Sequence, residues 1–477
     1  MITRRLLDAA ARVVDPPQRV KVYLIYGLAL PQLYFLPKGS SDVSLWTLVT
    51  LFLAPGIVIS CWSGSGRQLL RTGLVRVLLA LIAVRVVAWL VWSPDRSAGQ
   101  QPIALLVEFV VVVLLMLTVV RQDRDVFGRL QRVYWPAVVV EAALVVVFRL
   151  LPGVENAFLH TVGGVVIGQN TIAGLFGTQP NNVLDVAKSG GVFVNANVAA
   201  MFLGVSGLAA LAVWSVTRDS RVRLVGIGAL VAVLFTGSKS AILLAFLLPC
   251  LVFAAYYATR VARPAVRRGL LVGAAVLGVA GIVVLTTVDV GFVRALRHAF
   301  FERTEIWAYG GQAFVHHAVL GLGYGGWQSG FARYAAEHHI PRFPPHNMFL
   351  AAWAKTGLAG LALTAAFYVL LFRLVGRRLA RTTGRRTWFV LYAGAALAWT
   401  LIQGMGENTD IFGDIHLIPV VALLIACLIV PPDEETGDLA FPFADRRDRQ
   451  APAVPAFRNV HPQPGVGTAD VHAAVRG

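Results

Sequence analysis

The chain has 477 residues, of which 57% are hydrophobic and only 14% are charged. Apolar windows long enough to cross a bilayer recur along it, which excludes a soluble globular protein and predicts an all-α, polytopic integral membrane protein. A net charge of +17 would indicate nucleic-acid binding in a soluble protein. Here the basic residues lie between apolar windows, where they set membrane topology, so we expect membrane lipids as partners and no nucleic acid.

Windows of roughly 17 to 25 residues predict a helical bundle of about twelve transmembrane helices. The first window follows Arg19 and Lys21, contains Pro31 and lacks a small-residue cleavage site, so we expect a retained anchor rather than a signal peptide. In chain order the predicted helices lie near residues 20–36, 44–62, 74–92, 102–120, 134–151, 192–216, 222–237, 239–258, 269–289, 347–372, 387–404 and 413–430.

Basic side chains cluster before the first predicted helix and after every even-numbered one up to the tenth. By the positive-inside rule both termini lie in the cytoplasm, and the loops 152–190 and 290–346 face outward from the cytoplasmic (inner) membrane. The clusters are Arg4, Arg5, Arg12 and Arg19; Arg67 and Arg71; Arg121, Arg124, Arg129 and Arg132; Arg218, Arg221 and Arg223; Arg260, Arg263, Arg267 and Arg268; and Arg373, Arg377, Arg378, Arg381, Arg385 and Arg386.

Residues 1–430 are expected to form a transmembrane catalytic domain, whose large extracytoplasmic loop, 290–346, contains short helices. The segment 431–477 is rich in Pro, Asp, Glu and Arg without apolar periodicity, and predicts a disordered cytoplasmic tail. All three cysteines lie inside predicted helices, where each is most simply a small core residue.

Two glycine-rich stretches resemble nucleotide-binding motifs but lack their context. Residues 237–240 match only the end of a P-loop, and residues 321–326 lack the preceding strand of a dinucleotide fingerprint. The sequence has no HExxH or paired CxxC motif, and its scattered carboxylates form no obvious metal site. We therefore expect neither a cofactor nor a metal requirement.

Cationic and hydrogen-bonding residues lie instead at the outer membrane boundary. Lys239 ends the short loop between the seventh and eighth helices, Arg303 begins the large loop, and His346 and Asn347 end it. An anionic lipid head group at this depth needs fixed cations, and Arg can donate two parallel hydrogen bonds to phosphate. A phosphate-bearing lipid substrate fits this boundary, although a histidine there can also simply cap a helix.

Six short pieces between about residues 190 and 360 stand in a fixed order: GVFVNAN (191–197), TGSKSA (236–241), RTEIW (303–307), HAVLGLG (317–323), HNMFL (346–350) and GLAG (357–360). Their order and spacing on a scaffold of about twelve helices resemble the O-antigen ligase and O-antigen polymerase superfamily of polytopic glycosyltransferases. The pieces are individually weak signals, and their combination carries the resemblance.

The resemblance implies an enzyme that transfers a glycan from a polyprenyl pyrophosphate carrier to an acceptor hydroxyl, on a glycan or a lipid, outside the cytoplasmic membrane. It also implies that Arg303 and Lys239, which follows Ser238, bind the pyrophosphate, while His346 acts on the acceptor or orients it. Members usually have Arg where this chain has Lys239, and often a second His at the position of Pro344. Lysine keeps the charge but loses the forked geometry.

The remaining candidates have two interpretations each. Asn195 and Asn197 either cap the sixth helix or bind a sugar, and Trp307 and Trp327 either stack on a sugar or anchor the chain at the interface. Glu305 is the alternative catalytic base, and the motifs add His317, Gly323 and Asn347 as substrate-binding residues. In a late loop, Glu407, Asp410 and Asp414 either line the outer cavity or solvate the loop. Four charged residues inside predicted helices stay unassigned: Arg85, Glu108, Glu141 and Lys355.

Other functions remain open at this point. Ligase and polymerase differ only in the acceptor, which the motifs do not separate. A lipid-linked glycan transporter or flippase would favour polar groups near mid-membrane, broken helices and two related halves. The polar motifs concentrate at one outer face and no convincing internal repeat is seen, which favours the enzyme in cell-envelope polysaccharide biosynthesis.

The charge pattern makes a direct prediction about topology. A reporter fused near Gly325 should behave as external, and one fused near Thr383 as cytoplasmic, because the basic clusters follow even-numbered helices. Paired alkaline phosphatase and green fluorescent protein fusions at both positions would measure this. Cytoplasmic behaviour at Gly325 would overturn the assignment.

Overall fold

The computed structural model describes part of the chain in detail, all of it within a first compact unit, Met1–Phe443. The described residues are 18–30, 32–34, 43–62, 70–122, 124–176, 185, 187–260, 265, 269, 273, 291–407 and 411–430. The predicted ninth transmembrane helix, near 269–289, falls almost entirely outside these ranges, and so do the predicted tail, 431–477, and Asp410.

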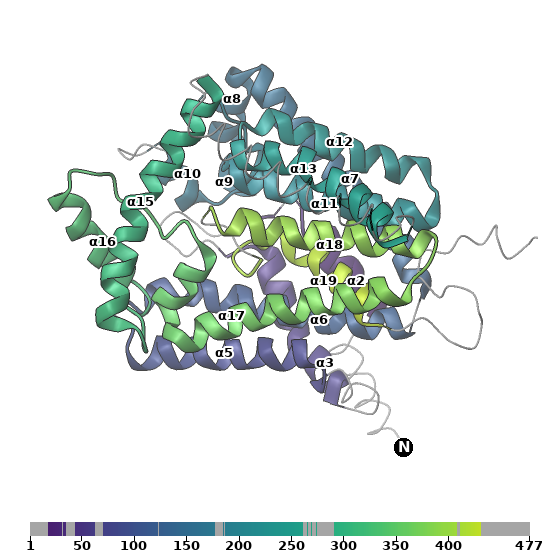
Figure 1. The fold of residues 1–477 in the computed structure, drawn as a ribbon, viewed down its shortest axis with the longest axis horizontal. Helices are drawn as coiled ribbons and strands as arrows, with labels where there is room; N and C mark the ends of the chain where they lie inside the picture. The colour runs from purple at the N-terminus through teal and green to yellow at the C-terminus, as the bar shows by residue number, and fades with distance from the viewer. Residues whose placement is uncertain are drawn as a thin grey trace, which may run out of the picture. The chain divides into compact units, whose positions relative to one another are not determined.

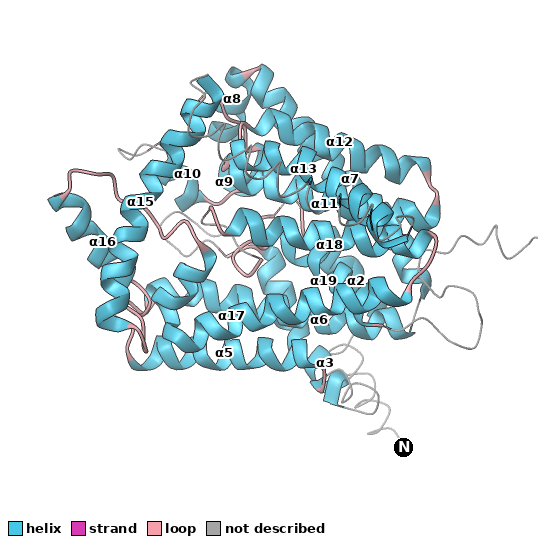
Figure 2. Ribbon diagram, in the orientation of Figure 1, coloured by secondary structure: helices cyan, strands magenta, loops and turns pink. Residues whose placement is uncertain are grey.

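The described residues form helices and no strand, which confirms the all-α membrane fold (Figure 2). Among the described residues, six helices are long and apolar enough to cross a membrane, with spanning segments at Gly73–Val91, Ser97–Val120, Val133–Leu150, Ala196–Thr217, Lys239–Ala258 and Met348–Arg381. The principal helices are α2 (Gln18–Gly27), α3 (Leu45–Trp62), α5 (Gly73–Val91), α6 (Ser97–Gln122), α7 (Arg124–Leu150), α11 (Ala196–Thr217), α12 (Ser220–Thr236), α13 (Lys239–Arg260), α17 (Met348–Arg381), α18 (Arg385–Gly404) and α19 (Leu417–Ile429).

Two predicted segments differ from the structure. The first predicted span, 20–36, is helical only as far as Gly27, since the chain bends at residues 28–30 ahead of Pro31. The outer loop, expected to hold short helices, is largely helical: α16 (Gly326–Glu337) is short, but α15 (Gly291–His317) has 27 residues. The length of α15 was not predicted, because its charged and aromatic residues interrupt the apolar pattern although the helix continues through them.

Helices α11 and α6 are the most buried of the candidate spans, and α11 lies in the middle of the molecule in Figure 1. Of the α11 span 89% is buried, and of the α6 span 83%, whereas only 33% of the α5 span and 28% of the α13 span are buried. The ends of α11 follow from its sequence. Asn195 caps its first turn by accepting hydrogen bonds from the backbone N–H groups of Asn197 (2.9 Å) and Val198 (3.4 Å), and Arg218 ends it in the left-handed conformation.

The two ends of the bundle differ in character. Short helices α8 (Pro152–Thr161), α9 (Gly163–Val166) and α10 (Gln169–Leu175) lie at the same end as α15 and α16, on the left of Figure 1. Basic residues gather at the opposite end. There Arg378 donates to the carbonyl oxygens of Leu428 (2.6 Å) and Ile429 (2.7 Å), which satisfies two of the free carbonyls that end α19.

Helix α17 is interrupted at Gly357, whose φ of 68° and ψ of −163° are non-helical. The turn after α15 fills the break, because Leu358 donates its N–H to the carbonyl of Val319 (3.1 Å) and Leu322 donates to that of Ala354 (2.7 Å). Irregular backbone at membrane depth is tolerated only where protein satisfies its polar groups. The HAVLGLG and GLAG pieces are therefore interlocked in space.

This interlock makes Gly357 intolerant of a side chain. A Cβ atom would overlap the carbonyl oxygen of Val319 and would require an L-residue at a conformation that only glycine readily adopts. We expect Gly357→Ala to cost on the order of 1–3 kcal/mol in stability, seen as a lower unfolding temperature in detergent. Gly376→Ala, in the same helix with open space around it, should be neutral or slightly stabilising. Equal unfolding temperatures for both variants would contradict the interlock.

Candidate active site

A buried carboxylate, Glu407, lies at the centre of the polar residues just after the C-terminal end of α18. Its side chain is 10% exposed, and both oxygens are engaged. Arg303 of α15 donates to Oε1 at 2.8 Å, and Asn197 of α11 donates to Oε2 at 2.9 Å. His346 approaches the same oxygen, with Nδ1 3.9 Å from Oε2. Arg303 and Asn197, which are 104 and 210 positions from Glu407, thus meet at its carboxylate.

A chain of hydrogen bonds fixes the α11 side of this cluster. Trp399 donates from its indole nitrogen to Gln403 Oε1 at 2.6 Å, and Gln403 Nε2 donates to the carbonyl oxygen of Asn197 at 2.7 Å. Both Trp399 and Gln403 are buried. Asn197 is therefore held at two points: Gln403 bonds its backbone carbonyl, and Glu407 accepts a hydrogen bond from its side-chain amide.

The histidine side of the cluster depends on the start of α17. Asn347 caps that helix by accepting from the N–H groups of Phe349 (2.9 Å) and Leu350 (3.1 Å), and it donates to the carbonyl of Met405 at 3.1 Å. This second bond ties the start of α17 to the loop that carries Glu407. His346 precedes the cap with a φ of 45°, a left-handed conformation that directs the chain into the helix.

Burial and charge tune the two titratable groups. Desolvation raises the pKa of Glu407, against the opposing effects of Arg303 and Lys188. For His346, burial and then the positive charge of Arg303 lower the pKa to about 4. The 3.9 Å between His346 Nδ1 and Glu407 Oε2 is too long for a hydrogen bond, so no hydrogen bond to the carboxylate stabilises the charged imidazolium. His346 is accordingly a neutral imidazole near neutral pH.

A second polar segment packs against the turn between α12 and α13. The N–H of Ser189 donates to the carbonyl of Thr236 at 3.1 Å, and Gly237 leaves no room for a Cβ beside the carbonyl oxygen of Ala187. This places Lys188, which also pairs with Asp185 at 3.7 Å, next to the turn that carries Ser238 and Lys239. Ser238 is 2% exposed, and its hydroxyl makes no hydrogen bond within the described parts of the chain.

Glu305, the alternative base, faces away from this cluster. It accepts a hydrogen bond from Tyr334 of α16 at 2.9 Å. Two residues along a helix correspond to about half a turn, so Arg303 and Glu305 lie on opposite faces of α15. His317 is exposed at the end of α15, and Gly323, with a φ of 74°, lies in the turn packed against Trp92 and Ser93.

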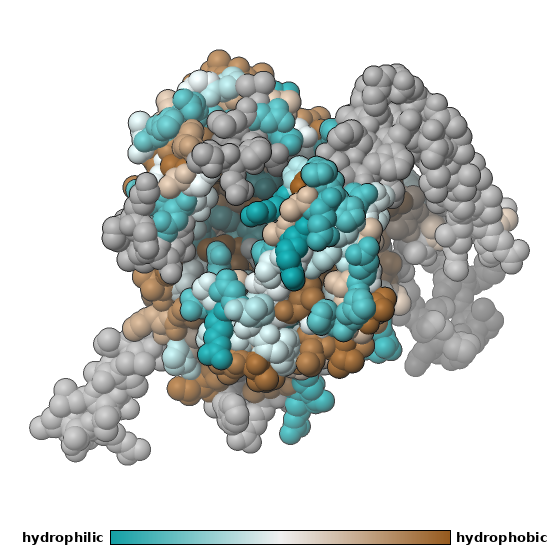
Figure 3. All heavy atoms as spheres, turned by 90° about the vertical axis from the view of Figure 1, so that its left-hand side faces the viewer, coloured by the Kyte–Doolittle hydropathy of each residue, from teal (hydrophilic) through white to brown (hydrophobic). Residues whose placement is uncertain are grey.

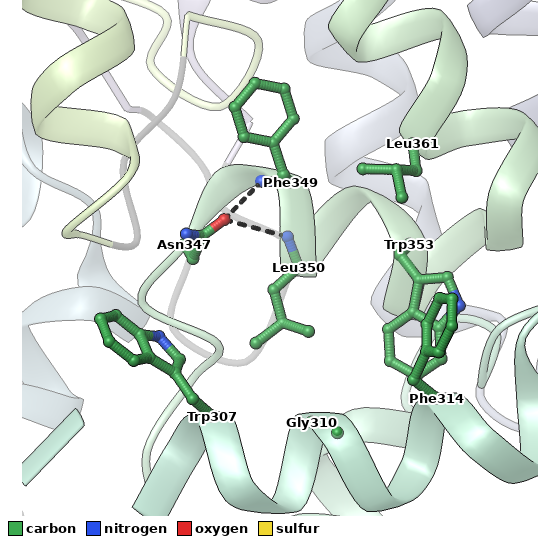
Figure 4. Close-up of a pocket in the computed structure, with 9 residues that line it drawn as sticks. Trp307, Gly310, Phe314, Asn347, Phe349, Leu350, Trp353 and Leu361 are labelled. Atoms are coloured by element: carbon green, nitrogen blue, oxygen red, sulfur yellow. Dashed lines mark hydrogen bonds between the residues drawn. The ribbon is translucent and has the colours of Figure 1, made fainter. Parts of the chain in front are cut away.

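Trp307 lines a mostly apolar pocket between α15 and the start of α17 (Figure 4). The pocket has a volume of about 490 Å³ and also includes Phe314, Asn347, Leu350 and Trp353. Trp307 lies one helical turn beyond Arg303 on the same face of α15. Ile306 and Ala313 are buried, and they pack in one cluster with residues of α16 and α17.

The end of the molecule that carries these residues is polar. Figure 3 turns it toward the viewer, and hydrophilic side chains gather there around a recess, with hydrophobic residues along the lower margin. Within the described ranges, no group of three or more His, Cys, Asp or Glu side chains could hold a metal ion. The metal independence expected from the sequence remains a prediction.

Two residues of this region were missing from the predicted site. Glu407 was expected either to line the outer cavity or to solvate a loop, and its contact with Arg303, across 104 positions, was not predicted. Lys188 belongs to a loop without a recognisable motif. A carboxylate between apolar segments was the available signal for Glu407, since such a group must find partners. Asn195 proves to cap α11, and Trp327 is buried, with its indole donating to the carbonyl of Phe343 at 3.1 Å.

Comparison with known proteins finds one family. Residues 224–365 match the family model described as O-Antigen ligase, which confirms the resemblance over less than a third of the chain. The matched range contains Lys239, Arg303 and His346, whereas Asn197 and Glu407 lie outside it. No curated protein matches the chain. The family supports a membrane glycosyltransferase-like role in polysaccharide biosynthesis.

Proposed function

We propose, from the premise that residues 224–365 form an O-antigen ligase family domain, that the protein transfers a glycan from a polyprenyl pyrophosphate carrier to an acceptor hydroxyl on the extracytoplasmic side. The observation that carries the proposal is the meeting of Arg303, His346 and Glu407 in one buried cluster beside an apolar pocket. A cation, a neutral base and a lipid-compatible surface are the parts that this reaction needs.

The donor diphosphate would be bound by Arg303 together with Lys239 and Lys188. Arg303 uses one nitrogen for Glu407, and its planar fork can offer the others to phosphate oxygens. Charge developing on the leaving pyrophosphate would be stabilised by these fixed cations, at roughly 3–4 kcal/mol for each well-placed donor. The adjacent pocket, with Trp307 at its edge, suits the apolar part of the carrier or a sugar ring stacked on the indole.

His346 is the proposed base for the acceptor. The acceptor oxygen attacks the anomeric carbon, its proton passes to the imidazole, and the bond from that carbon to pyrophosphate breaks with the electron pair leaving on the phosphate oxygen. A pKa of about 4 describes the donor-free protein and makes a weak base. A bound diphosphate would offset the charge of Arg303 and raise that pKa, while Glu407 faces the imidazolium that forms.

A lipid-linked glycan transporter is the second candidate. The interrupted α17 and the buried charges of Arg85 and Glu141 inside helices are features expected of transporters. The break, however, is filled by backbone from residues 319–322 rather than by a substrate. Ligase and polymerase remain distinguished only by the acceptor, which is a separate molecule in one case and a carrier-linked glycan in the other.

Arg303 should be essential for use of the donor. We expect Arg303→Ala to abolish product while the lipid-linked glycan accumulates, and Arg303→Lys to recover little because the fork is lost. Product and lipid-linked donor can be measured in proteoliposomes and in cells. Arg333→Ala, an exposed arginine of α16, is the control and should keep activity. Full activity of Arg303→Ala would remove this residue from the site.

His346→Ala should lose transfer but keep donor binding. General-base assistance is worth on the order of 10²- to 10⁴-fold, so we expect a fall of that order in the transfer rate, with binding of the pyrophosphate-linked glycan retained through Arg303. His316→Ala, an exposed histidine at the end of α15, should have no effect. If His346→Ala transfers normally and Glu305→Gln does not, Glu305 is the base instead.

The lowered pKa of His346 predicts an unusual pH profile. Only the neutral imidazole can accept a proton, and with a pKa of about 4 it stays neutral well below pH 6.5. We therefore expect kcat/KM, which reports the donor-free protein, to hold as the pH falls from about 8 to about 5 and to drop only through about 4. Measuring the pH profile of Glu407→Gln as well removes the titration of Glu407 and leaves that of His346. A drop centred near 6.5 would show an unperturbed histidine.

A further inference from the structure

We infer that Glu141 is a positioning residue that holds the turn carrying Asn197 against Glu407. The inference rests on the proposed function, because Glu141 acts on the same site indirectly, through the backbone that leads to Asn197. Glu141 lies within the spanning part of α7 and is 0% exposed. A carboxyl group in such a place is costly and calls for a reason.

The reason is visible in its contacts. Glu141 Oε2 accepts a hydrogen bond from the backbone N–H of Val192 at 3.1 Å, in the short 3-10 helix Gly191–Phe193 that leads into α11. Gly191 has a φ of 55°, and a Cβ at this position would overlap the carboxyl group of Glu141. The side chain thus fits closely beneath the turn and satisfies a backbone donor that apolar neighbours could not.

The turn at residues 191–194 has a backbone conformation that surrounding contacts must stabilise. Gly191 and Val194 both adopt left-handed conformations, with φ of 55° and 64°. Such a conformation is a genuine outlier for a β-branched residue like valine, and it persists only where surrounding contacts fix it. Glu141 supplies one such contact from α7.

Gln403 supplies the matching contact from α18. Its amide donates to the carbonyl of Asn197 at 2.7 Å, just past the point where the turn becomes helix. Asn197 in turn donates to Glu407 at 2.9 Å. Glu141 and Gln403 therefore hold the two ends of residues 191–197, and the path from Glu141 to the reacting region runs through this backbone. Loss of the Glu141 contact should shift Asn197 and, through it, the carboxylate beside His346.

The test compares Glu141→Gln with Glu141→Leu in proteoliposomes. Glutamine keeps the size and an acceptor oxygen for Val192, so Glu141→Gln should retain transfer within about threefold. Leucine removes the acceptor, and since a misplacement of about 1 Å can cost on the order of 10²-fold, Glu141→Leu should lose about that factor in kcat with KM for the donor little changed. Glu108→Leu, a matched substitution of another fully buried carboxylate in α6, should keep activity.

A double-mutant cycle distinguishes positioning from general damage to the fold. Because Glu141 acts through Asn197, Glu141→Leu combined with Asn197→Ala should be no slower than Asn197→Ala alone. Losses that multiply would overturn the inference, and so would full activity of Glu141→Leu. Should Glu141→Leu fail to accumulate, Gly191→Ala takes its place in the cycle, because its Cβ displaces the same contact.

The remaining outcomes are equally decisive. Inactive Glu141→Gln would assign a role to the charge or proton of Glu141, as a proton-coupled transporter requires, and would overturn positioning. If the wild-type protein itself transfers no glycan while Arg303→Ala changes nothing, the proposed function fails. The wild-type reaction and the Glu141 variants therefore report on the two proposals separately.

Discussion

The pairing of Glu407 with Arg303 and Asn197 joins α15, α11 and the segment after α18. A buried carboxylate is tolerated only when its oxygens receive hydrogen bonds, preferably from a cation. Here the donors come from α15 and α11, and the carboxylate itself follows α18. Satisfying one charge thus fixes three helices that are distant in sequence. His346, at the start of α17, is brought within 3.9 Å by the same arrangement.

The same pairing has a consequence for the binding of an anionic donor. In the donor-free protein Arg303 is already engaged by Glu407, so a diphosphate must share the guanidinium or displace the carboxylate. Burial raises the pKa of Glu407, which lowers the free-energy cost of protonating it when the anion arrives. On the proposed function, donor binding would be linked to proton uptake at Glu407, and the added negative charge would raise the pKa of His346. The site would become a better base once the donor is in place.

The sequence predicted the parts that local rules govern. Apolar windows located α11, α12, α13 and α18 to within a few residues. Capping by Asn195 was one of its two interpretations, because side-chain capping is a local interaction. Contacts between distant segments were not predictable in the same way. The bond from Arg303 to Glu407 leaves no periodic signal, and the break at Gly357 lies inside the window 347–372, which predicts one continuous helix. Arg303 and His346 were indicated by the family resemblance rather than by spacing.

The break at Gly357 connects the fold to the site. Residues 319–322 insert beside it and hydrogen-bond to both sides of the interruption, which pins the end of α15 to α17. The segment of α17 before the break then runs back along α15, so that Leu350 and Trp353 face Gly310 and Phe314 across the pocket. Arg303 precedes the pocket residues of α15, and His346 precedes those of α17. The spacing between Arg303 and His346 thus depends on Gly357, which follows His346 by eleven positions along the chain.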